Sequence, residues 1–313
     1  MRPELLHVFA PRFNPLRWAT PERHFRDFVA HMLDSGVKLH VIECQYGERP
    51  FSADLPKEVD FIGVRASSPA WSKENLINIG IQRAPEADYI CWCDADVFFE
   101  KPGWAAETVH ALQLYRWIQP WSQAIDRGPN GEILNGGRAF RSFGHQYEQG
   151  HPLVPDRHGW KSYGHDYPHP GFCHATTRRV LEYTGGLFEL GGMGAADHAM
   201  MLALVGQARA SAPPACNATF VAHLMRWQER ARHAVHGRLG YVHQVINHRF
   251  HGKKANRQYL SRWQMFLRHG FDPDTDLKRN SYGVLEWAGN KPELEREWML
   301  YLRSRREDDN ASD

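Results

Sequence analysis

The chain has 313 residues, of which 42% are hydrophobic and 24% are charged, and its formal net charge is +2. This composition is ordinary for a globular enzyme, and it excludes a chain that is disordered over most of its length. A transmembrane helix needs about 20 consecutive apolar residues. Because no stretch of the sequence approaches this length, we expect no membrane span.

The first hundred residues alternate between strand and helix signals. The predicted elements are strands at 5–13, 37–47, 60–67 and 89–99 and helices at 21–36 and 72–85. This repeated β-α-β pattern predicts a mainly parallel sheet with helices on its faces. Ligands bind at the carboxyl ends of the strands in such sheets. Asp94 and Asp96 lie at one such end, and Glu43 and Arg65 lie near two others.

The second half of the chain is less regular. Residues 128–171 are rich in Gly, Pro, His and aromatic residues, and a long irregular stretch is typical of an active-site loop or lid. Helical periodicity then returns at 174–186, 196–208, 218–235, 256–270 and 292–308. We expect one α/β domain over residues 1–255 and a helical C-terminal extension over residues 256–313, whose acidic tail EDDNASD is expected to be disordered.

The five cysteines are an odd number in a long chain, which disfavours a disulfide framework and indicates a reducing cytoplasm. Cys91 and Cys93 flank Trp92 in a predicted strand, so both point to one face and could form a thiolate metal site. No second Cys pair or His lies at ligand spacing, so we favour buried apolar cysteines.

Asp94 and Asp96 are the first candidates for chemistry. Burial of a carboxylate costs several kcal/mol unless a cation or hydrogen-bond donors compensate its charge. Two carboxylates at the open end of a parallel strand can ligate one hard divalent cation, which would bridge the phosphates of a nucleotide. A D-x-D pattern by itself is common on protein surfaces, so the strand context carries the hypothesis.

Polar residues on the helix before this strand form a second candidate. Lys73, Asn75 and Asn78 lie on that helix, with the two asparagines one turn apart on one face. They could equally be a solvent-facing lysine and ordinary helix polar residues. An Asn at an otherwise apolar helical position is costly without a partner, and this favours a functional role.

A glycine-rich turn presents the third candidate, Asp197. Glycines at 185, 186, 191, 192 and 194 precede it, and an apolar helix follows. An acid in the first turn of a helix is expected from the helix dipole alone. The same position could present a general base after a close backbone approach.

A basic segment contains the fourth candidate. Residues 221–270 hold ten Lys or Arg, seven His and a single acid, Glu229. Such a segment indicates an anionic partner, namely a diphosphate, a phosphorylated substrate or nucleic acid, although a solvated helix face is an equal alternative. His248 and His251 could complete a metal's ligand shell while neighbouring cations hold a diphosphate. Those cations are Lys253, Lys254 and Arg257.

The order of these motifs over residues 5–262 resembles the metal-dependent glycosyltransferases of the A-type fold, near family 2 and the galactosyl- and N-acetylgalactosaminyltransferases. The resemblance implies that Asp94 and Asp96 bind Mn²⁺ or Mg²⁺ and the nucleotide of a UDP-sugar. It makes His251 the third metal ligand, in preference to His248, because Gly252 follows it.

The sequence GMGAAD resembles the family's G-W-G-x-E-D motif, whose final acid is the base that deprotonates the acceptor, here Asp197. Met193 and Ala196 depart from the motif because they stand where Trp and Glu would be. That Glu usually holds the acceptor, so the acceptor class is open. Gly171 and Phe172 resemble the segment that lines the sugar site.

We therefore predict a glycosyltransferase that works by a single displacement with inversion. Further donor contacts are predicted for Pro11, Glu43, Arg65, Lys73, Asn75, Asn78, Asp94, Lys253 and Arg257. The acceptor is either a hydroxymethylated base in duplex DNA or a glycan, and the setting is the cytoplasm of a bacterium or a virus-infected cell.

Two other functions remain open from the sequence. A metal-dependent nucleotidyltransferase or phosphohydrolase would also use a D-x-D pattern, but it generally needs further acids for a second metal, and Asp166 is the one other acid near the loop motifs. A non-catalytic nucleic-acid-binding module would use the basic segment but would leave the D-x-D unexplained.

Overall fold

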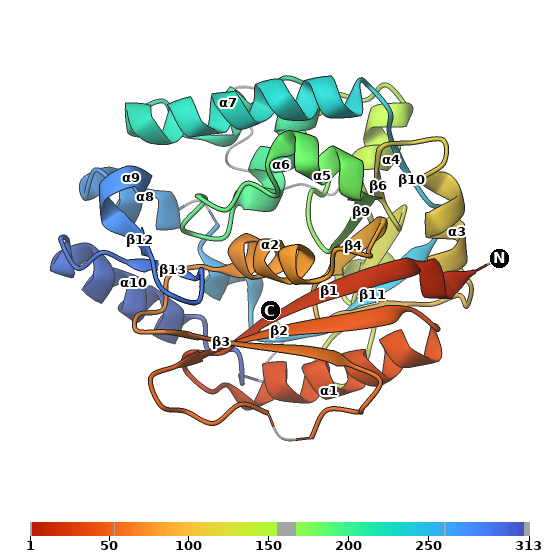
Figure 1. Cartoon of the computed structure of the whole chain (residues 1–313), viewed down its shortest axis with the longest axis horizontal. Coiled ribbons are helices and arrows are strands. Elements are labelled where there is room, and N and C mark those ends of the chain that lie inside the picture. The colour runs from red at the N-terminus through yellow and green to blue at the C-terminus, as the bar shows by residue number, and fades with distance from the viewer. Residues whose placement is uncertain (1, 53, 155–166, 260, 310–313) are drawn as a thin grey trace.

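The computed structural model describes residues 2–52, 54–154, 167–259 and 261–309. A seven-stranded sheet forms the centre of the molecule, in the order β10-β6-β9-β4-β1-β2-β3 (Figure 1). Its strands are β1 Leu6–Phe13, β2 Lys38–Tyr46, β3 Asp60–Ala66, β4 Tyr89–Cys93, β6 Trp117–Gln119, β9 Cys173–Thr177 and β10 Leu239–Tyr241. β3, β2, β1 and β4 are parallel, whereas β9 is antiparallel to both of its neighbours. The predicted α/β class with a mainly parallel central sheet flanked by helices is confirmed.

A second sheet has the order β5-β11-β7-β8. Its strands are β5 Val97–Phe99, β7 Gln123–Asp126, β8 Phe140–Arg141 and β11 Val245–His248. The predicted strand at 89–99 is therefore divided between two sheets, and Asp94 to Asp96 form the turn that connects them. The predicted helix at 174–186 was wrong in its first part, because β9 occupies this segment and places the β-branched Thr176 and Thr177 in a strand.

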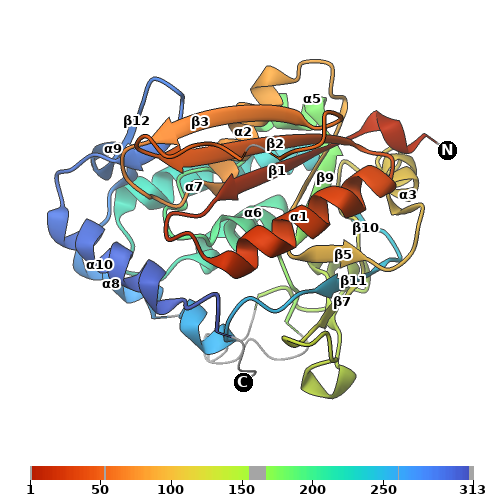
Figure 2. The same cartoon turned by 90° about the horizontal axis from the view of Figure 1, so that it is seen from below.

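Helices cover both faces of the central sheet. α1 Ala19–Asp34 lies on one face of β1 to β3 and α2 Lys73–Arg83 lies on the other (Figures 1 and 2). The other helices are α3 Trp104–Ala111, α4 Phe143–Glu148, α5 Arg178–Thr184, α6 Ala196–Leu204, α7 Ala218–Val235, α8 Arg262–Arg268, α9 Pro273–Asp276 and α10 Pro292–Ser304. No helix of the described residues is long and apolar enough to cross a membrane.

The C-terminal segment packs against the same core as α2, since Trp287, Trp298 and Leu76 belong to one buried cluster. It also contains the hairpin β12 Leu277–Arg279 and β13 Leu285–Trp287, which the helical prediction did not include. Two residues of the predicted disordered tail make defined contacts. Glu307 pairs with Arg305, and Asp308 accepts hydrogen bonds from the first backbone N–H groups of α1.

Candidate active site

A cavity of about 840 Å³ opens at the carboxyl ends of β1 and β4. Its walls come from segments far apart in the sequence: the end of β1, the start of α2, the turn after β4, residues 167–172, the start of α6 and the C-terminal segment. It is lined by eight of the predicted site residues: Pro11, Lys73, Asp94, Asp96, Gly171, Asp197, His251 and Arg257. The fold thus brings most of the predicted donor, metal and base residues together.

Asp94 is paired with the lysine predicted from the helix. Lys73 Nζ lies 2.5 Å from Asp94 Oδ1. Burial and the neighbouring charge of Asp96 raise the pKa of Asp94, while Lys73 opposes this shift. Lys73 also lies within the field of Asp197 and Glu74, so one cation is shared by three carboxyl groups. Lys73 would be positioned to contact an anionic ligand that displaces Asp94 from this ion pair.

Asp96 faces two imidazoles. Its Oδ2 is 2.7 Å from His251 Nε2 and 3.7 Å from His248 Nε2, and the ligand atoms of these residues lie within 4.8 Å of one another. Its Oδ1 is buried without a hydrogen-bond partner. Although burial opposes it, the charges of His251 and His248 hold the pKa of Asp96 well below its usual range. One ionised carboxylate and two imidazoles fit the ligand preference of a divalent transition metal such as Mn²⁺.

His248 therefore belongs to the candidate metal site together with His251, although the sequence favoured His251. Asp126 was missed by the sequence analysis. Its Oδ1 lies 2.8 Å from His248 Nδ1, and its other oxygen pairs with Lys254. A carboxylate on Nδ1 orients the imidazole and directs Nε2 toward a metal. No sequence signal connects these residues, which are neighbours because β7 and β11 pair in parallel.

Asp197 lies in the first turn of α6, as predicted, and its Oδ1 accepts a hydrogen bond from the His198 backbone N–H. Although burial opposes it, Lys73 and this N–H lower the pKa of Asp197. The carboxylate closely approaches the loop before β9, since a Cβ at Gly171 would lie 2.7 Å from Asp197 Oδ2. Glycine at 171 therefore leaves room beside this carboxylate.

Several guanidinium groups complete the cavity wall. Arg257 Nη2 lies 2.6 Å from His251 Nε2, and Arg257 Nε is buried without a hydrogen-bond partner. Arg12, Arg262 and Arg305 also line the cavity, as does Lys254, whereas the predicted Lys253 does not. This concentration of cations next to the candidate metal ligands suits a diphosphate.

Two predicted nucleoside contacts do not line the cavity. Glu43 is fully buried and accepts hydrogen bonds from Arg12, Gln45 and the backbone N–H of Ser52. Arg65 donates to the backbone oxygens of Gly47 and Arg49. Both side chains are committed to holding the segment after β2, so the structure does not support their inclusion in the donor site.

Asn75 and Asn78 also lie outside the cavity, on the side of α2 that faces Glu189. Asn78 Oδ1 accepts from the Leu187 N–H at 2.8 Å, and Asn78 Nδ2 donates to the Leu187 oxygen at 3.1 Å. Asn75 similarly connects α2 to Leu285. The sequence argument that a buried Asn needs a partner was sound, but the partners are backbone groups and the Glu189 carboxylate and not a ligand.

Replacing Asn78 with alanine is expected to lower the free energy of unfolding by about 1–3 kcal/mol, because the Leu187 N–H would be left buried without an acceptor. Urea denaturation measures this change. The exposed Gln82 on the same helix provides the control, and Gln82→Ala should have little effect. Equal stability of Asn78→Ala and the wild type would show that this bridge does not hold the loop.

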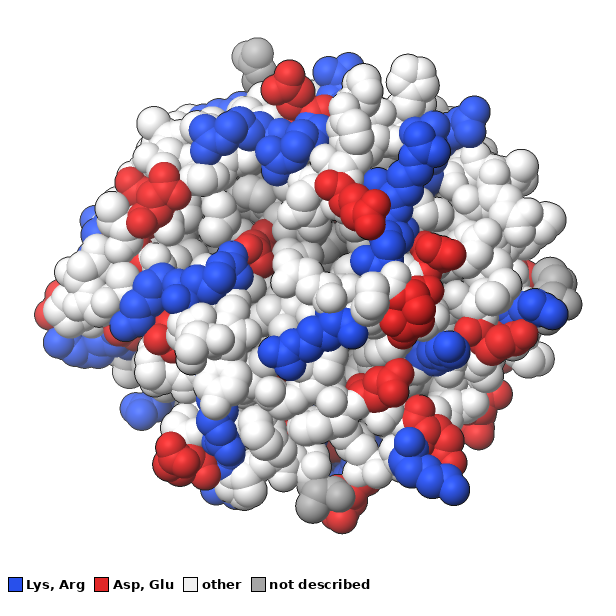
Figure 3. Space-filling view, in the orientation of Figure 1, with Lys and Arg blue, Asp and Glu red and all other residues white. Residues whose placement is uncertain are grey.

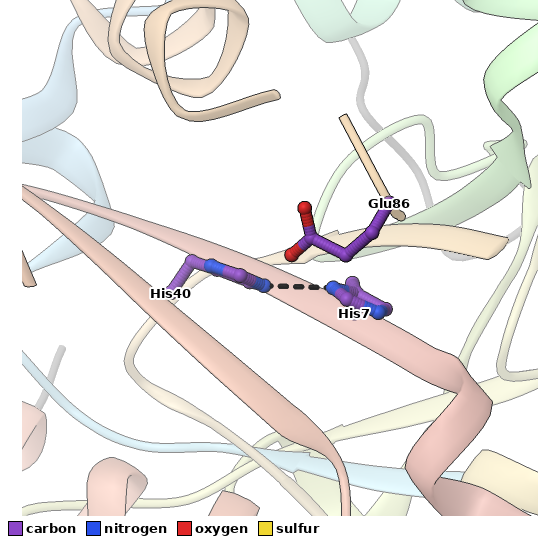
Figure 4. A group of neighbouring side chains, drawn as sticks. All are labelled: His7, His40 and Glu86. Atoms are coloured by element: carbon purple, nitrogen blue, oxygen red, sulfur yellow. Dashed lines mark hydrogen bonds between the residues drawn. The ribbon is translucent and has the colours of Figure 1, made fainter. Parts of the chain in front are cut away.

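A second cluster of possible metal ligands, His7, His40 and Glu86, lies at the amino end of β1, away from the cavity (Figure 4). His7 Nδ1 and His40 Nε2 are 2.8 Å apart, with ring centroids 5.0 Å apart and planes 13° apart. At this distance one ring nitrogen can donate a hydrogen bond to the other. We interpret the pair as a hydrogen bond between neutral imidazoles, since burial lowers both pKa values.

The basic segment divides into two parts. The cavity residues from it all lie between His248 and Trp263. The α7 arginines lie elsewhere: Arg230 donates to the Thr184 backbone oxygen, and Arg232 packs beside Gly206. On the face shown in Figure 3, Lys and Arg side chains are interspersed with Asp and Glu and form no broad area of one sign. The α7 arginines therefore do not extend the charge of the cavity.

Glu74 is a cavity residue that the sequence analysis missed. It is 4% exposed, and burial raises its pKa from 4.5 to about 7. Its position next to Lys73 was visible in the sequence, but nothing there distinguished it from an ordinary acid in the first turn of a helix.

The stability of the protein is expected to depend on pH through Glu74. Between pH 4.5 and 7 the unfolded state ionises before the folded state, so stability is lost as pH rises through this window. Glu74→Gln lacks this loss and should gain up to about 3 kcal/mol relative to the wild type between pH 5 and pH 8. Denaturation at both pH values measures the difference, with the exposed Glu58→Gln as control. If the difference in free energy of unfolding between Glu74→Gln and the wild type were the same at pH 5 and pH 8, ionisation of Glu74 would not destabilise the folded state.

No family model matches the sequence, and no curated protein matches it. Several solved structures are similar to this chain over much of its length. A Drosophila β1,4-galactosyltransferase 7 in complex with manganese, UDP-Gal and xylobiose is 12% identical, with 92% of this chain and 97% of that chain covered and a TM-score of 0.43. Staphylococcus aureus TarS with UDP-GlcNAc is 9% identical, with 86% of this chain and 74% of that chain covered and a TM-score of 0.43. A Mycobacterium tuberculosis glucosyl-3-phosphoglycerate synthase with Mn²⁺ and UDP-glucose is 12% identical, with 85% of this chain and 76% of that chain covered and a TM-score of 0.37.

Proposed function

We propose that the protein is a metal-dependent glycosyltransferase that transfers a sugar from a UDP-sugar to an acceptor hydroxyl. The observation that carries this proposal is the joint presence, in one cavity, of the Asp96, His248 and His251 cluster, a group of buried cations and the carboxylate of Asp197. A nucleotide-sugar transferase needs these three parts: a cation site, a diphosphate site and a base.

Asp96, His248 and His251 would hold Mn²⁺ or Mg²⁺, and Asp94 lies next to them. When bound, the cation supplies charge neutralisation for the leaving diphosphate. Arg257 and Lys73 would bind the phosphate oxygens, and Pro11 lies on the wall where the nucleoside would fit. Asp197 would accept the proton of the attacking hydroxyl, and the absence of an assigned nucleophile suits a single displacement with inversion.

A phosphohydrolase or nucleotidyltransferase remains the second candidate, because it would use the same cation and phosphate groups. Among the described residues, the Asp96 cluster offers one carboxylate and two imidazoles. A two-metal phosphoryl-transfer site would need more carboxylates there. Asp166, the further acid considered from the sequence, lies outside the described residues.

Calorimetry with UDP tests the proposal. The metal-free protein should bind UDP weakly, and addition of MnCl₂ should strengthen binding at least about tenfold, because a cation held by Asp96, His248 and His251 would offset the charge of the diphosphate. UDP binding that is indifferent to Mn²⁺ and to chelator would overturn the metal-dependent assignment.

A further inference from the structure

The wall formed by the amino-terminal end of α2 has two side chains without an assigned role. Trp71 and Glu74 both line the cavity, three residues apart, and Lys73 between them is directed to Asp94. Trp71 precedes the N-cap Ser72 and Glu74 lies in the first turn of α2, so both reach the cavity from one short segment.

Trp71 provides an apolar face with an unused donor. Its indole Nε1 is buried without a hydrogen-bond partner, although an unpaired buried donor costs about 1–3 kcal/mol. The ring is held on several sides, by Phe13 in an edge contact at 5.2 Å, by the Arg305 guanidinium at 5.5 Å, and by Gly194. A Cβ at Gly194 would lie 2.7 Å from the ring, and its φ of +78° also requires glycine.

Glu74 provides an unused acceptor. Its carboxyl receives a hydrogen bond from its own backbone N–H, and within the described part of the chain no other side chain hydrogen-bonds to it. The charge of Asp197 adds to burial in raising the pKa of Glu74. A buried carboxyl of this kind is normally hydrogen-bonded, and a ligand hydroxyl would satisfy it.

The glycine-rich turn cannot supply these two groups itself. Met193 is fully buried and Ala196 is 1% exposed, so neither of the two positions that depart from the expected motif is available to a ligand. The indole of Trp71 occupies the space over Gly194, and Glu74 adds a carboxyl within the field of Asp197. The start of α2 therefore brings an aromatic ring and an acid to the turn from a different element.

We propose that Trp71 and Glu74 form the acceptor subsite and that the acceptor is a neutral sugar, which packs against the part of the indole that lines the cavity and donates a hydrogen bond from a second hydroxyl to Glu74. This inference rests on the proposed glycosyltransferase function. Small ligand sites combine apolar and aromatic walls with a few placed polar groups, and a sugar ring matches such a wall because it presents both C–H faces and hydroxyls. The carboxyl groups of Glu74 and Asp197 disfavour a polyanion, and the α7 arginines lie outside the cavity.

The test measures sugar binding and UDP binding separately. Saturation-transfer NMR titrations use methyl β-glucoside, methyl β-galactoside and methyl β-xyloside with the wild type in the presence of UDP and MnCl₂. A duplex oligonucleotide with hydroxymethylated cytosine is the competing probe. The variants are Glu74→Gln, Trp71→Ala and the conservative Trp71→Phe, with Glu58→Gln as a matched exposed control. Calorimetry measures UDP affinity for each variant.

At least one glycoside is expected to bind. Glu74→Gln and Trp71→Ala should each weaken its affinity by about 10- to 100-fold, with UDP affinity nearly unchanged. Trp71→Phe should lose less than Trp71→Ala, because it keeps the apolar face. Wild-type glycoside affinity should rise between pH 6 and pH 8 as Glu74 ionises, and this rise should be absent in Glu74→Gln.

Wild-type glycoside affinity in both Glu74→Gln and Trp71→Ala would overturn the subsite. Binding of the duplex and of none of the glycosides would overturn the sugar acceptor. Failure of the wild type to bind UDP with Mn²⁺ would instead overturn the proposed function, and the acceptor inference with it, so the two failures are distinguishable.

Discussion

Replacing Asp96 with alanine is expected to abolish turnover and the Mn²⁺-dependent part of UDP binding. Asp96 contributes the carboxylate that lies within reach of both His248 and His251. Its removal would leave two imidazoles next to Arg257 and no carboxylate within the cluster to hold a dication. The variant should therefore lose metal binding, and it should lose Mn²⁺-dependent UDP binding as a consequence.

Calorimetric titration of UDP with and without MnCl₂ measures this effect, and circular dichroism checks that the variant is folded. The exposed Asp88→Ala is a matched control for the substitution itself and should behave as the wild type. If Asp96→Ala retained wild-type stimulation by Mn²⁺, the metal assignment would be wrong.

The second large effect is expected for Asp197→Asn, which keeps the shape of the side chain but removes its basicity. The turnover rate should fall by about 10²–10⁴-fold, which is the usual contribution of a positioned base. Donor binding should be retained, because Asp197 lies in the first turn of α6 and is not a member of the Asp96 cluster.

Turnover under saturating donor, together with UDP affinity, separates these two effects. Asp197→Glu provides a control that keeps the acid and should recover part of the rate. A variant Asp197→Asn with normal turnover would transfer the role of base to another carboxyl, and Glu74 would be the next residue to test, since its pKa of about 7 suits proton transfer.

The repeated β-α-β pattern was readable from the sequence because parallel strands and their helices have strong local periodicities. The position of Asp94 and Asp96 followed from it, since the strand that carries them ends at Cys93 in the centre of the sheet. Asp197 could be placed at a helix start on the same basis. These features depend on residues close together in the chain.

The errors have a common physical origin, because they required knowledge of which face of an element meets which partner. α2 is buried on most sides, so the choice between its cavity face and its Glu189 face could not be made from spacing. Glu43 lies in a strand near the predicted edge, but its side chain is sequestered by Arg12. Asp126 lies next to His248 only because β7 and β11 pair in parallel, which no local sequence pattern predicts.

The C-terminal segment shows the same limit. Trp298 and Arg305 line the cavity although they are about 200 residues from the D-x-D pair in the sequence. Their amphipathic helix pattern predicted α10 correctly, but no local pattern could show that its end returns to the site. Long-range placement of this kind is decided by packing of the common core.

The most direct test of the glycosyl-transfer assignment is identification of the products formed from a UDP-sugar. The wild-type protein is incubated with UDP-glucose, UDP-galactose and UDP-GlcNAc in turn, with MnCl₂ and the methyl glycosides, and products are identified by mass spectrometry and NMR. We expect UDP and a glycosylated acceptor to appear in equal amounts with one donor, and neither to appear after chelation of the metal. Release of UMP or inorganic phosphate without any glycosylated product would contradict the account and indicate a phosphohydrolase.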